Sequence, residues 1–160
     1  MSTLGRRGHG ERLATYYAEV RPEVVQPGGG KAVQHDGWEA VIKLDAEVTG
    51  GTITVLETRH DPGTGASPHV HSHESETFMV LEGEFTFQVG NTDVEVGAGG
   101  LVFGPQGVAH GFEPGPGGGR LLHLFVPSGM EGFFTAPRRN DSAEEGDRLR
   151  RAYGIASVDE

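Results

Sequence analysis

Short apolar runs alternate with turn residues between residues 32 and 127 of the chain. In Glu84–Val89 and Thr92–Val96, apolar and polar side chains alternate with a period of two residues, which is typical of strands with one buried face. Gly90-Asn91 joins these two runs and predicts a hairpin. The other runs that we expect to form strands are Trp38–Leu44, Thr52–Arg59, Pro68–His71, Glu76–Leu81, Leu101–Phe103, Ala109–Phe112 and Arg120–Val126. Strands at this even spacing indicate an all-β sandwich or barrel.

This pattern changes at both ends, so the sequence predicts a barrel over residues 32–127 that is flanked by two other segments. We interpret residues 1–31 as an N-terminal arm that packs across a sheet edge or a neighbouring subunit. Leu13, Tyr16, Tyr17 and Val20 fall at helical spacing and predict one amphipathic turn within it.

The C-terminal segment, residues 128–160, has helical rather than strand-like patterning. We expect a turn or short helix over Gly129–Phe134 and a helix over Asp141–Tyr153. In the second helix, Ser142 is the predicted N-cap and Glu145 closes a capping box.

Composition supports a chain with many tight turns, because glycine supplies 27 and proline 9 of the 160 residues. The run Gly115–Gly119 lacks the Lys, Ser or Thr of a phosphate-binding loop, and we expect it to be a flexible loop. Cysteine is absent, which excludes disulfides, thiolate metal sites and a cysteine nucleophile.

The net charge of −10 and the lack of a basic cluster argue against a nucleic-acid partner. The first residues contain arginines but no following apolar segment of a signal peptide, and no apolar run reaches membrane-spanning length. We therefore expect a cytoplasmic protein without a membrane partner. Because two-fold dimers are the commonest oligomers, we also expect a homodimer.

Histidines carry the candidate chemistry. On a strand, His69 and His71 point to the same face, and Glu76 begins the next strand-like run. His110 begins a later strand, and a barrel can bring it beside the first pair. Three imidazoles and one carboxylate suit a divalent transition metal or zinc. From spacing alone the alternative stays open that these are ordinary polar residues on exposed strands.

At these residues the sequence resembles the cupin family. The first cupin motif, Gly-x5-His-x-His-x3,4-Glu-x6-Gly, is matched by Gly63, His69, His71, Glu76 and Gly83. The second, Gly-x5-Pro-x-Gly-x2-His-x3-Asn, is matched by Gly99, Pro105, Gly107 and His110, and Pro114 replaces its final Asn.

The resemblance implies a double-stranded β-helix, the jelly-roll barrel of cupins. It also implies that His69, His71, Glu76 and His110 bind one divalent metal ion per subunit, whether Fe, Mn, Ni, Co, Cu or Zn. The sequence is most similar to small single-domain quercetinase-like cupins. Cupins carry out many reactions, so the family alone does not select one.

Strand parity predicts the residues around the metal. If Glu76 faces inward, Phe78 and Val80 do too, and Phe112 follows His110 in the same way. These side chains either form an apolar substrate pocket or fill the barrel core. His123 is either a hydrogen-bonded core residue or a catalytic acid or base beside Glu76. We expect His73 to lie in the turn outside the metal ligands, and His9, His35 and His60 to be solvated.

Three functions are compatible with these residues. The first is a quercetinase-like dioxygenase acting on an enol or phenol such as a flavonol or polyketide, a flat aromatic small molecule. The second is a non-redox cyclase, isomerase or lyase that uses the metal as Lewis acid and Glu76 or His123 as base. The third is a non-catalytic module that binds a small molecule.

Overall fold

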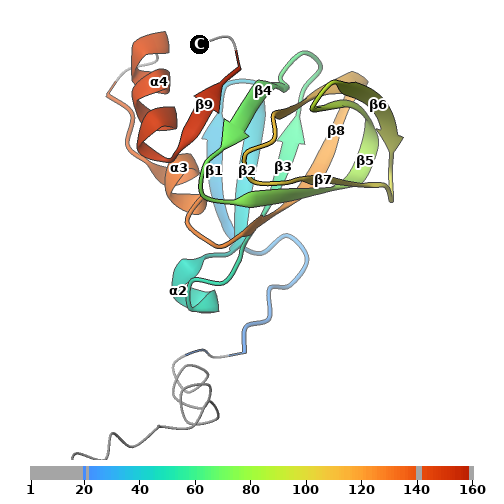
Figure 1. Cartoon of the computed structure of the whole chain (residues 1–160). Coiled ribbons are helices and arrows are strands. Elements are labelled where there is room, and N and C mark those ends of the chain that lie inside the picture. The colour runs from blue at the N-terminus through green and yellow to red at the C-terminus, as the bar shows by residue number, and fades with distance from the viewer. Residues whose placement is uncertain (1–19, 21, 140–141, 159–160) are drawn as a thin grey trace, which may run out of the picture.

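The computed structural model describes residues 20, 22–139 and 142–158, which form an antiparallel β-barrel with three helices (Figure 1). The strands are β1 (Lys31–His35), β2 (Trp38–Leu44), β3 (Thr54–His60), β4 (Ala66–His71), β5 (Ser75–Val89), β6 (Thr92–Gly97), β7 (Leu101–Gly104), β8 (His110–Val126) and β9 (Ile155–Ser157). The helices are α2 (Ala46–Thr49), α3 (Glu131–Thr135) and α4 (Ala143–Ala152).

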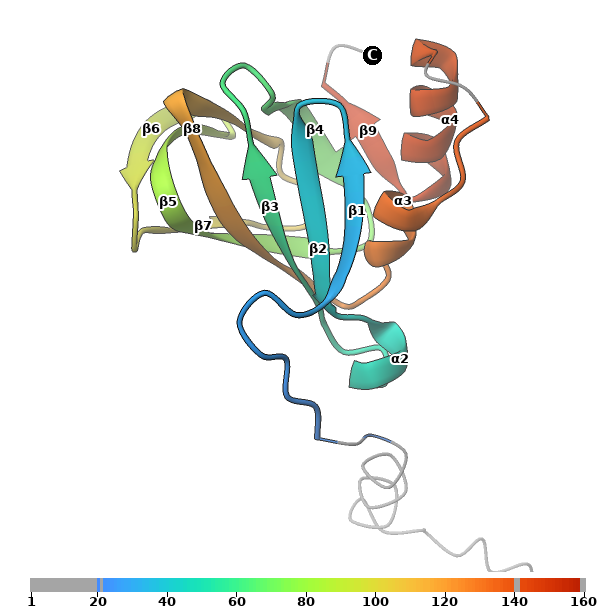
Figure 2. The ribbon, with the colours of Figure 1, turned by 180° about the vertical axis from the view of Figure 1, so that it is seen from behind.

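Two long strands hold the barrel together. β5 and β8 pair along nearly their whole lengths, from Ser75↔Val126 to Val89↔His110. On its other side β8 pairs with β4 near its start and with β3 near its end. β5 likewise pairs with β7 near its start and with β6 near its end. Strands β1, β2 and β3 extend the sheet beyond β8, as seen from behind in Figure 2.

The structure confirms the all-β double-stranded β-helix and joins several strands that the sequence separates. Glu76–Leu81 and Glu84–Val89 belong to one strand, β5. The predicted runs Ala109–Phe112, from His110 onward, and Arg120–Val126 belong to β8. The predicted hairpin at Gly90-Asn91 is confirmed by the Val89↔Thr92 pair. The break between the two runs predicted over Glu76–Leu81 and Glu84–Val89, at Gly83, is a register shift inside a continuous strand.

The prediction of a flexible loop at Gly115–Gly119 is wrong, because this run lies inside β8. Its glycines allow three backbones to approach closely at the bend. A Cβ at Gly118, whose φ is +68°, would lie 2.4 Å from the carbonyl oxygen of His60, and one at Gly83 would lie 2.4 Å from that of Gly118. Glycine there serves close strand packing rather than mobility.

The barrel interior contains two apolar clusters. One lies between β5, β7 and β8 and contains Phe78, Val80, Phe85, Phe87, Val102, Phe112 and Leu121. The other contains Ile42, Leu56, Phe125, Met130 and Ile155. Phe133, Phe134 and Tyr153 of the C-terminal segment pack against the second cluster.

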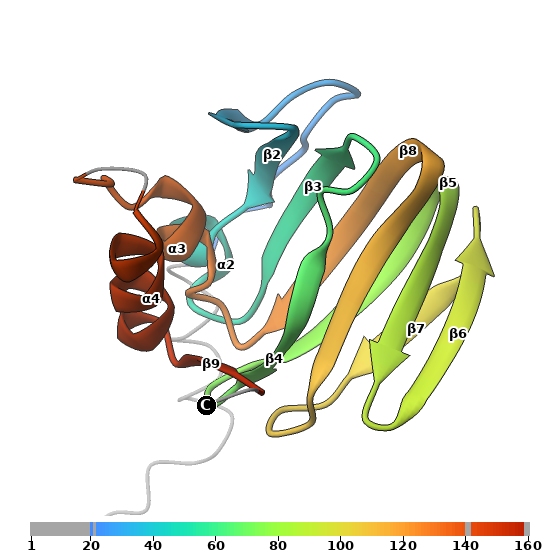
Figure 3. The ribbon, with the colours of Figure 1, turned by 90° about the horizontal axis from the view of Figure 1, so that it is seen from above.

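The C-terminal segment docks on the side of the barrel away from β6 and β7 (Figure 3). The predicted N-cap at Ser142 is confirmed, since its side chain accepts a hydrogen bond from the Glu145 backbone N–H. The expected helix start at Asp141 lies outside the described residues. Beyond α4, β9 pairs with His69, Val70 and His71 of β4, a strand that the sequence did not predict.

Of the predicted N-terminal arm, residues 1–19, with the expected helical turn, and His9 lie outside the described residues. Residues 22–30 form no helix or strand, and their end is held along β2 by the Lys43 side chain, which donates to the Gly29 carbonyl (2.7 Å). None of the helices in the described part of the chain has the length and apolar character needed to span a membrane.

Candidate metal centre

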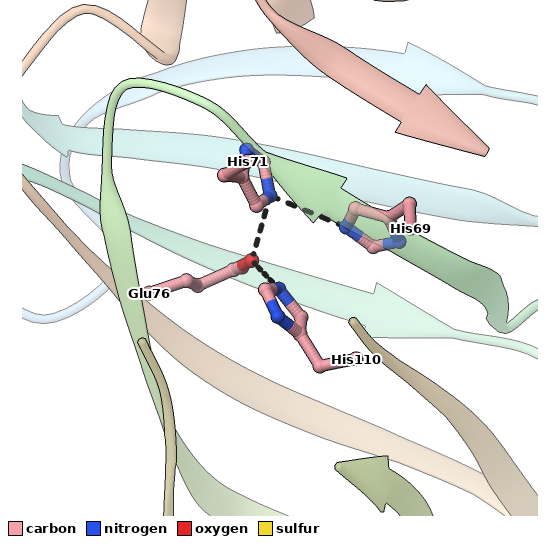
Figure 4. Close-up of side chains that lie close together, drawn as sticks. All are labelled: His69, His71, Glu76 and His110. Atoms are coloured by element: carbon pink, nitrogen blue, oxygen red, sulfur yellow. Dashed lines mark hydrogen bonds and ion pairs between the residues drawn. The ribbon is translucent and has the colours of Figure 1, made fainter. Parts of the chain in front are cut away.

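Four side chains from three strands converge inside the barrel (Figure 4). β4 supplies His69 and His71, two positions apart on one face, while β5 supplies Glu76 and β8 supplies His110. His69 and His110 are register partners across β4 and β8, so the sheet itself places their rings together. These are the four residues that the sequence nominates as ligands, and the structure brings them to one point.

The distances between their donor atoms suit a single cation. His69 Nε2 lies 3.2 Å from His71 Nε2, and Glu76 Oε2 lies 3.1 Å from the Nε2 atoms of both His71 and His110. The four donor atoms all lie within 4.8 Å of one another. With metal–donor bonds of about 2.1 Å, two ligands at right angles lie about 3.0 Å apart. Such a group could therefore hold a metal ion.

Two backbone hydrogen bonds orient the rings toward the centre. His69 Nδ1 donates to the carbonyl of Ser67 (2.8 Å), and His110 Nδ1 donates to that of Val108 (3.0 Å), in each case two residues earlier. A carbonyl only accepts, so whenever either ring is in the neutral form that binds metals, its Nε2 atom carries the lone pair. These lone pairs face the Glu76 carboxylate and a third imidazole. A divalent cation is attracted to all of them, and this donor set fits one.

Burial and charge act together on these groups. His71, Glu76 and His110 are almost fully buried. Burial lowers the pKa of His69 to about 4. Burial also lowers the pKa of His71, but hydrogen bonding and charge from Glu74 and Glu76 outweigh it and raise that pKa to about 9. Burial opposes ionisation of Glu76, yet the surrounding histidines hold its pKa well below the usual range, so it is a carboxylate.

A cavity of about 600 Å³ opens beside the cluster. His69, His71 and Glu76 lie on its wall. Aromatic side chains from the barrel and the C-terminal segment form much of the remainder: Trp38, Phe112, Phe125, Phe133 and Phe134. Two arginines, Arg138 and Arg150, also line it. The cavity thus combines a flat apolar lining with positive charge.

The three apolar residues expected around the metal divide between wall and core. All three are buried and face inward, as strand parity predicts. Phe112 lines the cavity, whereas Phe78 and Val80 lie in the apolar cluster between β5, β7 and β8. The ring of Phe78 still packs edge-on against His110 and His123, with ring centroids 5.7 and 5.2 Å away.

His123 lies beside the cluster and bonds to one of its members. It is 3% exposed, and its Nδ1 lies 2.8 Å from Glu76 Oε1. The ring also lines the cavity. Its position is compatible with both predicted roles, a hydrogen-bonded core residue and an acid or base, because it is hydrogen-bonded in the core and also lines the cavity.

Sequence reasoning missed two polar residues and a carboxylate near the site. His60 was expected to be solvated, which is wrong, because it is 6% exposed and bonds through Nε2 to Thr58 Oγ1 (2.9 Å). The inward alternation of β3, with Leu56, Thr58 and His60 all buried, carries the signal that could have found both. Glu74 approaches His71 Nδ1 at 3.6 Å.

Two further histidines differ in their surroundings. His73 is exposed in the turn after β4 and outside the four-residue cluster. His35, also expected to be solvated, is half-buried, and its ring stacks on Trp38 with centroids 3.8 Å apart.

Comparison with known proteins places the fold. A family model described as a cupin domain matches residues 56–125, which include all four clustered residues. No curated protein matches the sequence. Among solved structures, KdgF from a Halomonas species is similar at 15% identity and a TM-score of 0.62, over 69% of this chain and 98% of that one.

Two other solved structures are similar to about the same degree. An RmlC-like cupin from Shewanella frigidimarina has 22% identity and a TM-score of 0.60, over 71% of this chain and 97% of that one. A predicted oxalate decarboxylase from Thermotoga maritima has 22% identity and a TM-score of 0.60, over 66% and 99%. At such identities the likeness concerns the fold. Residues 56–125 thus match a cupin domain, and the barrel as a whole has the cupin fold.

Proposed function

We propose that this cupin is a metal-dependent enzyme, most specifically a quercetinase-like dioxygenase that acts on the enol or phenol oxygen of a flat small molecule. The observation that supports it is the position of the four-residue cluster beside an aromatic cavity, whose wall three of its members line. His69, His71, Glu76 and His110 would hold one divalent ion. Bound there, that ion supplies a Lewis acid for an anionic oxygen and, if redox-active, a route to reaction with dioxygen.

The cavity lining supports a planar, acidic substrate. Flat aromatic walls at Trp38, Phe112 and Phe134 offer stacking surface to a ring system. Glu76 is the only carboxylate among the described residues that line the cavity, while Arg138 adds positive charge and Arg150, which is paired with Asp147, lies at the same wall. A phenolate or enolate is therefore favoured over a cation.

The Glu76–His123 pair is the proposed acid–base group. Glu76 Oε1 and His123 Nδ1 lie 2.8 Å apart, so a proton held between them can be given to a bound substrate and recovered from it. This pair also favours a second candidate, a non-redox cyclase, isomerase or lyase, because proton transfer by Glu76 and His123 needs no oxygen.

Metal content and oxygen dependence test the proposal. Protein purified without added metal is analysed for bound metals, and oxygen uptake is then measured with a panel of flavonols and polyketide-like phenols. We expect turnover that His71→Ala abolishes and that the matched control His73→Ala, outside the cluster, leaves intact. Turnover that continues under strict anaerobiosis, or that zinc-loaded protein sustains equally, would replace the dioxygenase with the non-redox enzyme. Saturable binding without any turnover would contradict both.

The proposed setting is a cytoplasmic homodimer acting on a small molecule. The general prevalence of two-fold dimers supports the assembly, and the acidic sequence without a basic cluster supports the absence of a nucleic-acid partner. Light scattering on the purified protein tests the dimer, and the mass of a single chain would contradict it.

A further inference from the structure

A buried row of polar side chains runs away from the metal cluster into β3. His123 Nδ1 contacts Glu76 Oε1 (2.8 Å), and His123 Nε2 contacts Thr58 Oγ1 (2.7 Å). Thr58 Oγ1 in turn contacts His60 Nε2 (2.9 Å), and His60 Nδ1 contacts the carbonyl of Thr64 (2.7 Å). Thr58, His60 and His123 are each at most 6% exposed. The row is continuous from a backbone carbonyl to a candidate ligand.

The direction of every hydrogen bond in this row follows from its outer end. The Thr64 carbonyl can only accept, so His60 Nδ1 donates to it. The Thr64 hydroxyl donates to the Asp61 carbonyl (2.7 Å), so toward His60 it too acts as an acceptor. Burial lowers the pKa of His60 to about 4, which keeps its ring neutral near pH 7. His60 Nε2 therefore presents a lone pair to Thr58.

The single hydroxyl proton of Thr58 is therefore used in the hydrogen bond to His60. Thr58 must donate to His60 Nε2, so it can only accept from His123, and His123 Nε2 must carry the proton of that bond. The short contact between His123 Nδ1 and Glu76 Oε1 then requires a further proton, which these two atoms share. Oε1 is occupied by this bond, while Oε2 faces His71 and His110.

We propose that Thr58 and His60 are positioning residues of the metal centre, which fix the hydrogen bond from His123 to Glu76 and leave Oε2 as the ligating oxygen. The inference rests on the proposed metal-dependent function. Neither residue touches the candidate ligands. They act through His123, in the way that partners behind a metal's direct ligands orient those ligands.

A matched pair of variants tests the role of the hydroxyl. Thr58→Val keeps the shape of the side chain and removes its proton and lone pairs, whereas Thr58→Ser keeps both. We expect Thr58→Val to weaken Zn²⁺ binding by about 10- to 100-fold, with Thr58→Ser close to the parent protein. Competition with a chromogenic chelator measures the affinity, and thermal unfolding of the metal-free proteins checks that each variant folds.

A spectroscopic measurement separates positioning from a structural effect. In zinc-loaded protein labelled with ¹⁵N-histidine, both ring nitrogens of His123 should have shifts of protonated nitrogen, and His123→Gln assigns them. In Thr58→Val, Nε2 should move to the shift of an unprotonated nitrogen. His60→Phe should do the same at a distance, because the Thr58 hydroxyl is then free to donate to His123. This variant also serves if Thr58→Val does not fold.

The outcomes distinguish this inference from the proposed function. If the parent protein binds no Zn²⁺, the metal centre and its positioning residues both fail. If it binds Zn²⁺ and all variants match it in affinity and in His123 shifts, the positioning role alone is overturned.

Discussion

The barrel interior contains an apolar cluster between β5, β7 and β8, which we call the apolar end, and the polar residues around the candidate metal centre, which we call the polar end. The strands β5 and β8 contribute to both. At the apolar end, Phe78, Phe85 and Phe87 of β5 pack with Phe112 and Leu121 of β8. At the polar end, β5 contributes Glu76 and β8 contributes His110 and His123. The change occurs within one step of the strand alternation, because Glu76 and Phe78 are consecutive inward positions.

The difference lies in what each end demands of its residues. Apolar contacts have no direction, so the apolar end needs only well-packed volume to stabilise the fold. At the polar end every buried group needs a specific partner, because an unpaired one is costly. We therefore expect substitutions at the apolar end to change stability, and those at the polar end to change metal binding and pH dependence.

The largest effect should follow from Phe87→Ala at the apolar end. Phe87 is fully buried, with ring contacts to Phe78, Phe85 and Phe112. Removing its ring should lower the free energy of unfolding by about 3–5 kcal/mol, which urea denaturation measures. Zn²⁺ affinity of the folded fraction should stay within a few-fold of the parent protein. The conservative Phe87→Leu should lose less stability, and a large loss of affinity in either variant would show that the two ends are not separable.

The next effect should appear as a pH dependence that His60 imposes. Its folded-state pKa of about 4 is below the ordinary value of 6.5, so the unfolded chain binds the proton more readily. The contribution of this group to stability is complete above pH 6.5 and is lost as the pH falls toward 4. It amounts to about 3 kcal/mol, because each tenfold difference in proton affinity between the two states corresponds to about 1.36 kcal/mol. Urea denaturation of metal-free His60→Gln between pH 7 and 4 should therefore show a shallower loss of stability than the parent protein. If the unfolding free energies of the two proteins fall in parallel with pH, groups other than His60 cause the acid sensitivity.

A third experiment is the counterpart of Phe87→Ala, because it changes a residue of the polar end and leaves the apolar end intact. Glu76→Gln keeps the size of the side chain and removes the charge of the candidate ligand. Zn²⁺ affinity should fall by about 100-fold or more, beyond what outer partners of a metal site usually cost. The stabilisation gained at a fixed excess of Zn²⁺ should shrink by about 2.7 kcal/mol, as thermal unfolding with and without the metal measures. Glu74→Gln is the matched carboxylate control and should lose less. Equal losses in the two variants would remove Glu76 from the ligands.

Local sequence patterns predict the candidate ligands at the polar end better than they predict residues whose role depends on the pairing of distant strands. The candidate ligand set follows from the period of two in His69-x-His71 and from the two cupin motifs, and both are local sequence patterns. His60 and Thr58 were missed because their importance depends on β3 lying beside β8 in the register Leu56↔His123. No single-strand pattern contains that pairing.

Glycine was the other point at which local signals misled. Gly83 and Gly115–Gly119 are typical of turns and loops, yet both lie within long bent strands. Glycine is needed at these positions because β3, β5 and β8 approach one another closely there, and this tertiary contact is not visible in local sequence. β9 was missed for a similar reason, since three residues become a strand only by pairing with β4.

The smallest predicted effect tests whether the C-terminal segment belongs with the polar end. β9 pairs with the strand that carries His69 and His71, and α4 precedes it, so loosening α4 could disturb the ligands. Ser142→Ala removes the N-cap bond to Glu145 and should cost about 1 kcal/mol of unfolding free energy, measured by urea denaturation. Zn²⁺ affinity should not change, because the orientation of His69 is fixed by the Ser67 carbonyl within its own strand. Ser142→Asp, which retains a capping oxygen, should restore stability. A parallel loss of affinity in Ser142→Ala, recovered in Ser142→Asp, would instead make α4 and β9 part of the support of the metal centre.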